Sequence, residues 1–386
     1  METREGTFEH KSGQQIVRTA SRGLAVRSAA LVVRGLRDMA RDSNWLIKKV
    51  FPGATSRLAV SSAGAVSLIA PADHSGAQRV LLYDIERSAV TLALAVPGET
   101  GSSRGTGTAS ANEFPATFGW SPTARHLVAA WGAWPAALHI FDLQGKMLLG
   151  TFGDFRNFPE CLAWSSEARF FAATSAGGKG ATLRVWASGN DGALFTPAPA
   201  SEMGVPDGFE RQTYEAEFGE EGAFGGYGRT IFSPDEKSLA SVIEIRGDWA
   251  DDSIVLADVP TLRKQNVFQA QGHITDLTWT PDSAQIVYCA AGQAYRLDAQ
   301  SMAFEPLPFG AELCVCHPHL PLCICYSSWL KNSAKGRLFL VDLRRQTIFD
   351  EYAADGIADM CWSADGTKAY AMTRDGMAYI YEPPLL

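Results

Sequence analysis

The chain has 386 residues, a formal charge of −8 and 46% hydrophobic residues. Its acidic balance excludes a general nucleic-acid binder, and no stretch approaches the roughly 20 apolar residues of a membrane-spanning helix. The start, Met1-Glu2-Thr3-Arg4, does not have the pattern of a signal peptide. The seven cysteines, an odd number, are expected to be reduced thiols. These features predict a protein of the cytoplasm or of another reducing intracellular compartment.

Residues 1–43 are predicted to form an extension that contains a helix over residues 19–41. The helical stretch has no proline and is rich in Ala, Leu, Val and Arg. Plotted as a helix, it is apolar on most of its circumference, with a narrow stripe of Arg27, Arg34 and Arg41 at seven-residue spacing. A helix of this kind is expected to be buried from more than one side. We therefore expect it to contact a second surface besides its own domain.

Three interpretations of this helix remain open from the sequence. It covers the flank of its own domain, it docks on another protein, or its basic side lies on anionic lipids as in a peripheral membrane protein. Arginine forms bidentate hydrogen bonds to carboxylates, which favours docking on a protein. The contact residues expected there are Val26, Arg27, Val33, Arg34, Leu36, Arg37 and Arg41.

A short apolar phrase returns seven times after residue 44, and its first copy is Val80-Leu81-Leu82-Tyr83-Asp84. All copies but one end in an acidic residue. The final residues are Asp84, Asp142, Ala187, Asp258, Asp298, Asp342 and Glu382. They are 58, 45, 71, 40, 44 and 40 residues apart. A basal period near 40 with strands throughout predicts propeller blades, and the recurring aspartates are predicted to form turns.

A second apolar phrase precedes the first at a similar offset. It closes on an aromatic residue and a turn, as in Phe118-Gly119-Trp120-Ser121-Pro122 and Met360-Cys361-Trp362-Ser363-Ala364-Asp365. Proline presets the backbone of such a turn, and aspartate accepts hydrogen bonds from the backbone beyond it. This phrase is predicted to be the first of four strands in each blade.

Two insertions, at residues 97–113 and 196–228, account for the two longest intervals. The first is rich in Gly, Ser and Thr and is predicted to be a flexible connection. The second has seven acidic residues between Glu202 and Glu221, together with aromatic residues. It is either a solvated loop or an acidic arm that grips a basic surface of a partner. The contact residues of such an arm are Glu215, Glu217, Glu220 and Glu221.

The fifth repeat carries a family resemblance. There Gly272-His273 leads into Trp279-Thr280-Pro281-Asp282, which resembles the Gly-His opening and the Trp-Ser/Thr-Pro-Asp turn of the WD40-repeat family. No repeat ends in Trp-Asp and the Gly-His pair occurs once, so the chain resembles a divergent member. The resemblance covers residues 44–386. It implies a seven-bladed propeller that serves other proteins as a rigid platform.

The last repeat ends without an outer strand, because the chain stops four residues after Glu382. Residues 45–51, Trp45-Leu46-Ile47-Lys48-Lys49-Val50-Phe51, have the composition of a strand. We expect them to complete the seventh blade, which removes two free sheet edges. The predicted fold is all-β: a seven-bladed WD40-like propeller over residues 44–386, closed by an N-terminal strand and preceded by a helical extension.

The sixth repeat holds the strongest candidates for a metal site, which are Cys314, Cys316, His317, His319, Cys323 and Cys325. Alternation along two strands places the cysteines pairwise on one face of each strand. However, Cys316 aligns with Trp279 and Trp362, which are packing positions. The spacing also differs from the Cys-x2-Cys pairs of zinc sites. The sequence therefore predicts buried thiols and no metal.

No pattern of nucleophile, base and oxyanion donors is visible in the chain. The sequence predicts a non-enzymatic protein–protein interaction platform, a structural or scaffolding subunit of a larger complex, with no cofactor, nucleic acid or small-molecule substrate. One alternative is a peripheral membrane protein that uses the basic apolar helix. The other, less favoured, is an enzyme with a loop-borne site on the face of the ring.

Overall fold

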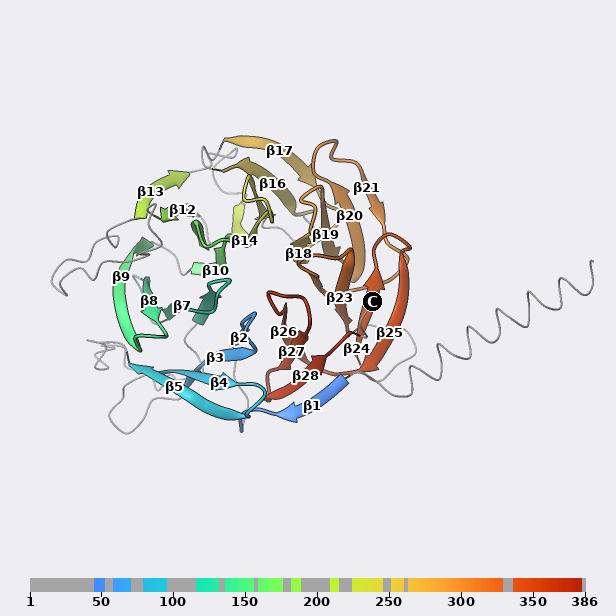
Figure 1. Cartoon of the computed structure of the whole chain (residues 1–386). Helices are drawn as coiled ribbons and strands as arrows, with labels where there is room; N and C mark the ends of the chain where they lie inside the picture. The colour runs from blue at the N-terminus through green and yellow to red at the C-terminus, as the bar shows by residue number, and fades with distance from the viewer. Residues whose placement is uncertain are drawn as a thin grey trace, which may run out of the picture. The chain divides into compact units, whose positions relative to one another are not determined.

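The computed structural model describes residues 45–52, 58–70, 79–95, 116–131, 136–155, 159–175, 182–188, 209–214, 224–245, 251–259, 263–328 and 336–383. These residues form seven antiparallel sheets of four strands each. The sheets stand around a common centre, so this part of the chain is a seven-bladed β-propeller (Figure 1). The prediction of an all-β propeller is confirmed. None of the described residues belongs to a helix long and apolar enough to cross a membrane.

Blades one to four follow the chain, each from its innermost to its outermost strand. They consist of β2 (Leu58–Val60), β3 (Ala65–Ala70), β4 (Arg79–Asp84) and β5 (Ala89–Ala95); β6 (Ala116–Trp120), β7 (His126–Trp131), β8 (Ala136–Asp142) and β9 (Met147–Phe155); β10 (Pro159–Trp164), β11 (Phe170–Ser175), β12 (Thr182–Ser188) and β13 (Phe209–Tyr214); and β14 (Phe224–Phe232), β15 (Ser238–Ile245), β16 (Ser253–Asp258) and β17 (Lys264–Gln269).

Blades five to seven complete the ring. They consist of β18 (Ile274–Trp279), β19 (Gln285–Ala290), β20 (Gln293–Asp298) and β21 (Phe304–Pro306); β22 (Leu313–Cys316), β23 (Leu322–Ser327), β24 (Arg337–Asp342) and β25 (Thr347–Ala353); and β26 (Ile357–Trp362), β27 (Ala369–Thr373), β28 (Met377–Tyr381) and β1 (Trp45–Lys49). In blade seven the outer strand β1 pairs with β28 in antiparallel register, from Trp45 opposite Tyr381 to Lys49 opposite Met377.

The two middle strands of a blade are buried on both faces, because neighbouring blades stack face to face. In blade six every residue of β23 is buried, and so are the four central residues of β24. The outer strands β21 and β25 face solvent, and most of their residues are exposed. Burial on both faces requires a continuous apolar run. This explains why the most regular repeated phrase in the sequence is that of the third strand.

Four of the five aspartates that end third strands form turns, as predicted: Asp84, Asp142, Asp298 and Asp342. Asp142 Oδ1 accepts hydrogen bonds from the backbone N–H groups of Gln144 (2.9 Å) and Gly145 (3.2 Å). Asp298 and Asp342 accept equivalent bonds from the residues two and three positions ahead. These carboxylates are therefore used to shape the turns to the fourth strands.

The predicted turns after the first strands are also confirmed. Thr280 Oγ1 donates to Asp282 Oδ1 at 2.6 Å and accepts the N–H of Gln285 at 3.0 Å. Ser363 makes the same two bonds, to Asp365 Oδ1 and from the N–H of Lys368. In an antiparallel four-stranded blade these turns and the aspartate turns lie at the same end. We call this end of the ring the turn face.

The structure differs from the insertion expected at 196–228. Within that range Phe209–Tyr214 forms β13, which pairs with β12 as the outer strand of blade three, and β14 begins at Phe224. Part of the expected loop is therefore propeller. The insertion at 97–113 lies outside the described residues.

Candidate functional site

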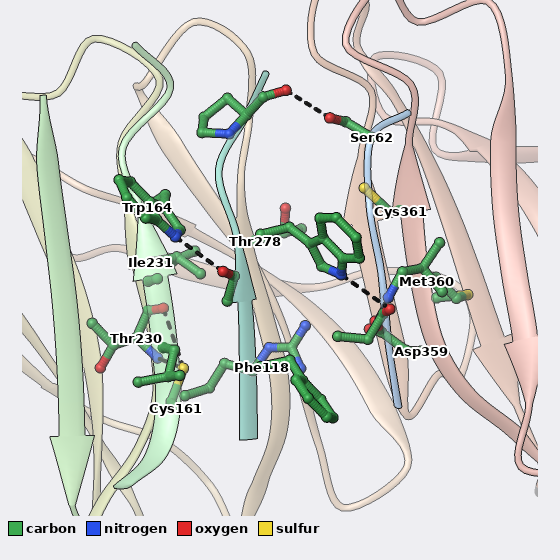
Figure 2. Close-up of a pocket in the computed structure, with 18 of the residues that line it drawn as sticks. Ser62, Phe118, Cys161, Trp164, Thr230, Ile231, Thr278, Asp359, Met360 and Cys361 are labelled. Atoms are coloured by element: carbon green, nitrogen blue, oxygen red, sulfur yellow. Dashed lines mark hydrogen bonds between the residues drawn. The ribbon is translucent and has the colours of Figure 1, made fainter. Parts of the chain in front are cut away.

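The innermost strands of all seven blades line a cavity of about 850 Å³ at the centre of the ring (Figure 2). Its wall carries polar and charged side chains among aromatic ones. Four of them come from one strand position, three residues before the residue that ends the strand, which we call the wall position. It holds Thr117, Cys161, Arg229 and Asp359 in blades two, three, four and seven. In blade five the same position holds Asp276, which is buried and is not part of the cavity lining.

β-Bulges set the wall position in alternate blades. The pairing register of the first two strands shifts just before Cys161 in blade three, Asp276 in blade five and Asp359 in blade seven. A bulge kinks the strand and re-aims the side chain that follows. All three side chains accept a hydrogen bond from the next blade, from the N–H of Thr230 (3.3 Å), Cys314 (2.9 Å) and Val60 (2.7 Å) respectively.

These bonds satisfy donors that the sheets leave open. An innermost strand has a partner strand on one side only, so half of its N–H groups point toward the channel or the neighbouring blade. The three acceptors join blades three and four, five and six, and seven and one. They therefore act as links between blades.

Arg229 is one of two arginines among the described residues that line the cavity, and the other is Arg374. Arg229 lies within an irregular stretch of β14 between Tyr227 and Thr230 and forms an ion pair with Asp276, with Nε 2.6 Å from Oδ1. The Asp276 side chain is 1% exposed, whereas that of Arg229 is 40% exposed, and it lines the cavity. The bend in β14 thus directs the guanidinium across the blade interface, with part of its surface left to the channel.

Burial controls the protonation of this cluster. Loss of water raises the pKa of Asp276 to about 7, although the Arg229 cation opposes the shift. Burial also raises the pKa of Asp359, again against the effect of Arg229. In return Asp276 raises the pKa of Arg229, so the guanidinium stays charged.

A carboxyl group with a pKa near neutrality is a common feature of acid–base catalysts. In Asp276, however, Oδ1 already accepts the N–H of Leu277 at 2.9 Å and faces Arg229, while Oδ2 accepts the N–H of Cys314. Both oxygens are occupied by the protein itself. The geometry fits a structural link better than a base that takes a proton from a substrate.

Indole groups form a second set of links. Each donates its Nε1–H to a backbone carbonyl of the preceding blade: Trp120 to Ala59 (3.2 Å), Trp164 to Gly119 (3.1 Å), Trp279 to Ile231 (3.4 Å) and Trp362 to Val315 (3.0 Å). In blades four and six the same position holds Phe232 and Cys316, which lack this donor. The alignment of Cys316 with the tryptophans is therefore confirmed.

The two histidines of blade six lie in the turn after β22, where their rings hydrogen-bond backbone groups. His317 Nδ1 accepts the N–H groups of His319 (2.9 Å) and Leu320 (3.0 Å), which leaves Nε2 to donate to the carbonyl of Gly366 at 3.0 Å. His319 Nε2 lies 3.1 Å from the carbonyl oxygen of Ala364. Among the described residues, no three His, Cys, Asp or Glu side chains are grouped so as to hold a metal ion. The absence of a metal in blade six stays a prediction.

The predicted contact residues lie outside the described residues. These are Val26, Arg27, Val33, Arg34, Leu36, Arg37 and Arg41 in the extension and Glu215, Glu217, Glu220 and Glu221 in the second insertion. The cluster of Arg229, Asp276 and Asp359 was not predicted from the sequence. A signal for it exists, because the wall position recurs at a constant offset before the aromatic residue of the first strand.

Comparison with known proteins supports the fold. No protein family model matches the chain, and no curated protein matches it. A chain in the structure titled "Crystal Structure of Mitotic Checkpoint Complex" aligns with a TM-score of 0.58 at 14% identity, over 88% of this chain and 91% of that chain. A chain in the structure of Kuenenia stuttgartiensis hydrazine synthase aligns with a TM-score of 0.58 at 15% identity, over 86% and 97%.

These two neighbours come from a checkpoint complex and from a synthase, so the shared fold does not determine function. At such identities the likeness concerns architecture. With its seven four-stranded sheets and these structural neighbours, the chain is a seven-bladed β-propeller, as the WD40-repeat resemblance predicted.

Proposed function

We propose that this protein is a non-enzymatic protein–protein interaction platform, a scaffolding subunit of a larger assembly. The observation that carries the proposal is that the turn face is cross-linked from blade to blade. A surface held in one conformation loses little entropy when a partner binds. The described turns of the propeller supply such a surface.

The cross-links of the turn face join successive blades. Ser62 Oγ donates to the carbonyl of Pro122 at 2.7 Å, between blades one and two. The buried carboxylate of Glu236 in blade four accepts the N–H of Glu167 in blade three at 2.6 Å and pairs with Arg169. The N–H of Asp235 donates to Ser283 Oγ of blade five at 3.0 Å. Neighbouring turns therefore brace one another.

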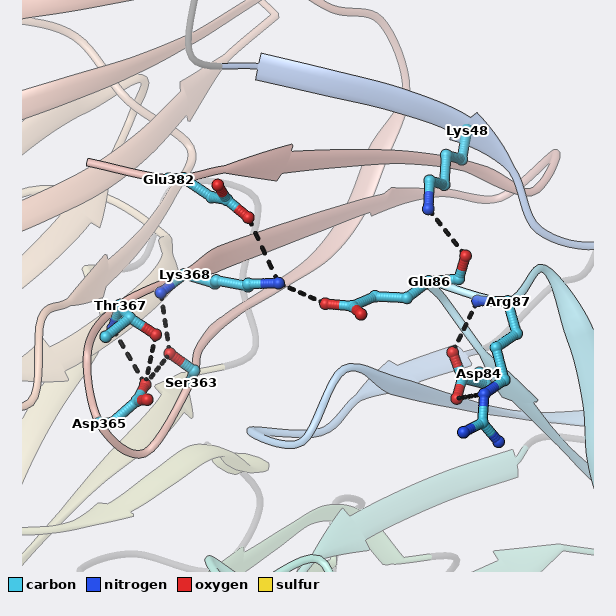
Figure 3. A network of polar contacts seen from close by, with 9 residues as sticks. All are labelled: Lys48, Asp84, Glu86, Arg87, Ser363, Asp365, Thr367, Lys368 and Glu382. Carbon is cyan, nitrogen blue, oxygen red and sulfur yellow. Dashed lines mark hydrogen bonds and ion pairs between the residues drawn. The ribbon is translucent and has the colours of Figure 1, made fainter. Parts of the chain in front are cut away.

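A network of polar contacts joins blades seven and one (Figure 3). Lys368 of blade seven bridges the carboxylates of Glu86 and Glu382. Lys48 of β1 donates to the carbonyl of Glu86 at 2.7 Å. We propose that β1 closes the ring through these bonds together with its ladder to β28, and that a closed ring is what keeps the turn face rigid.

The assignment as a non-enzymatic protein is supported by the channel. Its buried carboxylates are already bound by backbone N–H groups and by Arg229. Carboxylates that are already hydrogen-bonded within the protein stabilise the ring. A catalytic carboxylate, in contrast, must be able to hydrogen-bond its substrate. The protein is therefore proposed to act through its surface.

The test is charge reversal on the turn face. Arg87, Lys237 and Arg345 project from it with side chains 78%, 80% and 82% exposed. Their ion pairs are local and exposed, and such pairs add little stability. The variant Arg87→Glu/Lys237→Glu/Arg345→Glu should fold normally and lose its partners when a tagged chain is purified from its native source.

The control is Lys264→Glu, a single charge reversal on the exposed outer strand β17. It should retain the partners of the parent chain. Retention of the same partners by the triple variant would show that the turn face is not the docking surface.

The extension is proposed as a second docking element. Its predicted helix has more apolar surface than one flank can cover and carries an arginine stripe for carboxylates of a partner. This part of the proposal rests on the sequence alone.

A further inference from the structure

Blade six contains an unusual concentration of thiols. Cys314, Cys323 and Cys325 are fully buried, and Cys289 of blade five lies in the same apolar cluster. Cys316 is half-buried and lines the central cavity. Of the four cysteines in this hairpin, Cys316 is thus the one that a small molecule in the cavity reaches first.

The register places the four cysteines in two cross-strand pairs. Cys314 lies opposite Cys325, and Cys316 lies opposite Cys323. The N–H groups of Cys314 and Cys316 point away from β23, since they donate to Asp276 and to Thr278 of blade five. Both pairs are therefore of the non-hydrogen-bonded kind, in which side chains of antiparallel strands approach most closely.

This geometry is compatible with a disulfide. In such pairs the Cα atoms are about 4.5 Å apart, within the range of about 4.4–6.8 Å seen across disulfides. The Cys323 sulfur lies 3.7 Å from that of Cys325. Burial raises the pKa of Cys323, and the neighbouring thiols of Cys314, Cys316 and Cys325 raise it further. The Cys316–Cys323 bond can therefore form with little movement of the backbone.

The two other thiols that line the cavity lack such a partner. Cys161 lies opposite Thr174, and Cys361 lies opposite Tyr370. Three cysteines therefore line the cavity, but only Cys316 has another cysteine opposite it on the neighbouring strand.

We propose that Cys316 and Cys323 form a peroxide-sensitive dithiol, in which Cys316 is the site of oxidation and Cys323 the resolving thiol. The proposal does not depend on the function proposed above. Cys316 occupies the place of the tryptophans whose indole groups link other blades. Blade six therefore lacks the indole link to the preceding blade, and the proposed bond joins the first two strands within blade six instead.

The oxidant is a hydroperoxide. The Cys316 thiolate attacks one peroxide oxygen, the O–O bond breaks, and with hydrogen peroxide the second oxygen leaves as water after taking up the thiol proton. The Cys323 sulfur then attacks the sulfur of the resulting sulfenic acid. The S–O bond breaks, an S–S bond forms, and the hydroxyl group leaves as water with the Cys323 proton.

The test uses the full chain, treated with a small excess of hydrogen peroxide, quenched and alkylated in denaturant. Peptide mass spectrometry should show loss of two alkylation sites and of two hydrogen atoms, placed by fragmentation between Cys316 and Cys323. Thiol reductant should restore both sites. Cys316→Ser should abolish the bond, whereas Cys314→Ser, its control on the same face of β22, should retain it.

A second variant tests the proposal even if Cys316→Ser does not fold. In Cys323→Ser the resolving thiol is gone, so Cys316 should accumulate as a sulfenic acid that dimedone traps. The proposal is overturned if the parent chain forms no bond at a peroxide concentration that oxidises Cys161 or Cys361. It is equally overturned if the bond joins Cys314 to Cys325 or persists in Cys316→Ser.

Discussion

One strand position decides how neighbouring blades are joined. It holds Cys161, Asp276 and Asp359 in blades three, five and seven, and each accepts an N–H of the next blade. In blade four the same position holds Arg229, which pairs with Asp276. Repeats with the same backbone therefore carry different side chains at the channel. The residue type decides whether the position links blades, carries charge or does both.

Two glycines of the turns provide a matched pair for measuring backbone and packing effects. Gly366 and Gly292 both have positive φ, at 73° and 76°. A Cβ at Gly366 would lie 2.3 Å from the His317 ring, whereas a Cβ at Gly292 meets nothing within 4 Å. Gly292→Ala should cost about 1 kcal/mol of unfolding free energy from backbone strain alone.

Gly366→Ala should cost about 3 kcal/mol, because the ring of His317 must move and its bond to the Gly366 carbonyl is lost as well. Urea unfolding of both variants measures the difference. Equal losses would mean that the contact between His317 and blade seven contributes nothing.

His317 should make stability depend on pH. Burial lowers its pKa, and Nδ1 must stay unprotonated to accept the N–H groups of His319 and Leu320. In the unfolded chain its pKa is about 6.5, so below that pH the unfolded state binds a proton that the native state resists. Stability is therefore complete above about pH 6.5 and falls as the pH is lowered.

The expected result for His317→Ser is a shallower loss of unfolding free energy between pH 7 and pH 5, measured by urea titration. A residual slope should remain, since burial also lowers the pKa of His126 and His139 to about 4. Identical slopes in parent and variant would contradict the role of His317.

At the scale of strands, exposure decides which elements can be read from the sequence. Middle strands such as β23 are buried throughout and were predicted from their apolar runs. Outer strands such as β21 and β25 are largely exposed, so their sequences carry a weak apolar pattern. The sequence of β13, Phe-Glu-Arg-Gln-Thr-Tyr, has no apolar run either, so the sequence pattern predicts a loop there although the segment is a strand.

The strand β1 provides a test of ring closure. Deleting residues 1–51 removes the partner of β28 and the Lys48 bond to Glu86, which leaves an exposed sheet edge. This truncation should aggregate in size-exclusion chromatography. Deletion of residues 1–41 keeps β1 and should leave a folded ring. A soluble chain that starts at Pro52 and melts cooperatively would contradict the closure.

For the molecule as a whole, the open question is how the propeller is held in its assembly. Replacing Val26, Val33 and Leu36 by Asp should release the protein from its partners while thermal melting of the propeller is unchanged, because the predicted apolar face of the helix is lost. Replacing Arg27, Arg34 and Arg41 by Glu should weaken association more at low salt than at high salt, since salt already screens the attraction.

Co-purification from the native source measures both effects. If both variants retain the partners of the parent chain, the extension is not the docking element. The turn-face variant then decides whether the contact lies on the propeller.

The number and order of the blades, the buried third strands and most of the turn aspartates were determined by the sequence itself, because they follow from local patterns that recur along the chain. Tertiary structure decided the channel. Arg229, Asp276 and Asp359 come from blades four, five and seven, and their contacts arise only when the ring brings these blades around one centre. The sequence pattern around a carboxylate does not tell how deeply it is buried, and burial raises the pKa of Asp276 to about 7 against the opposing effect of Arg229.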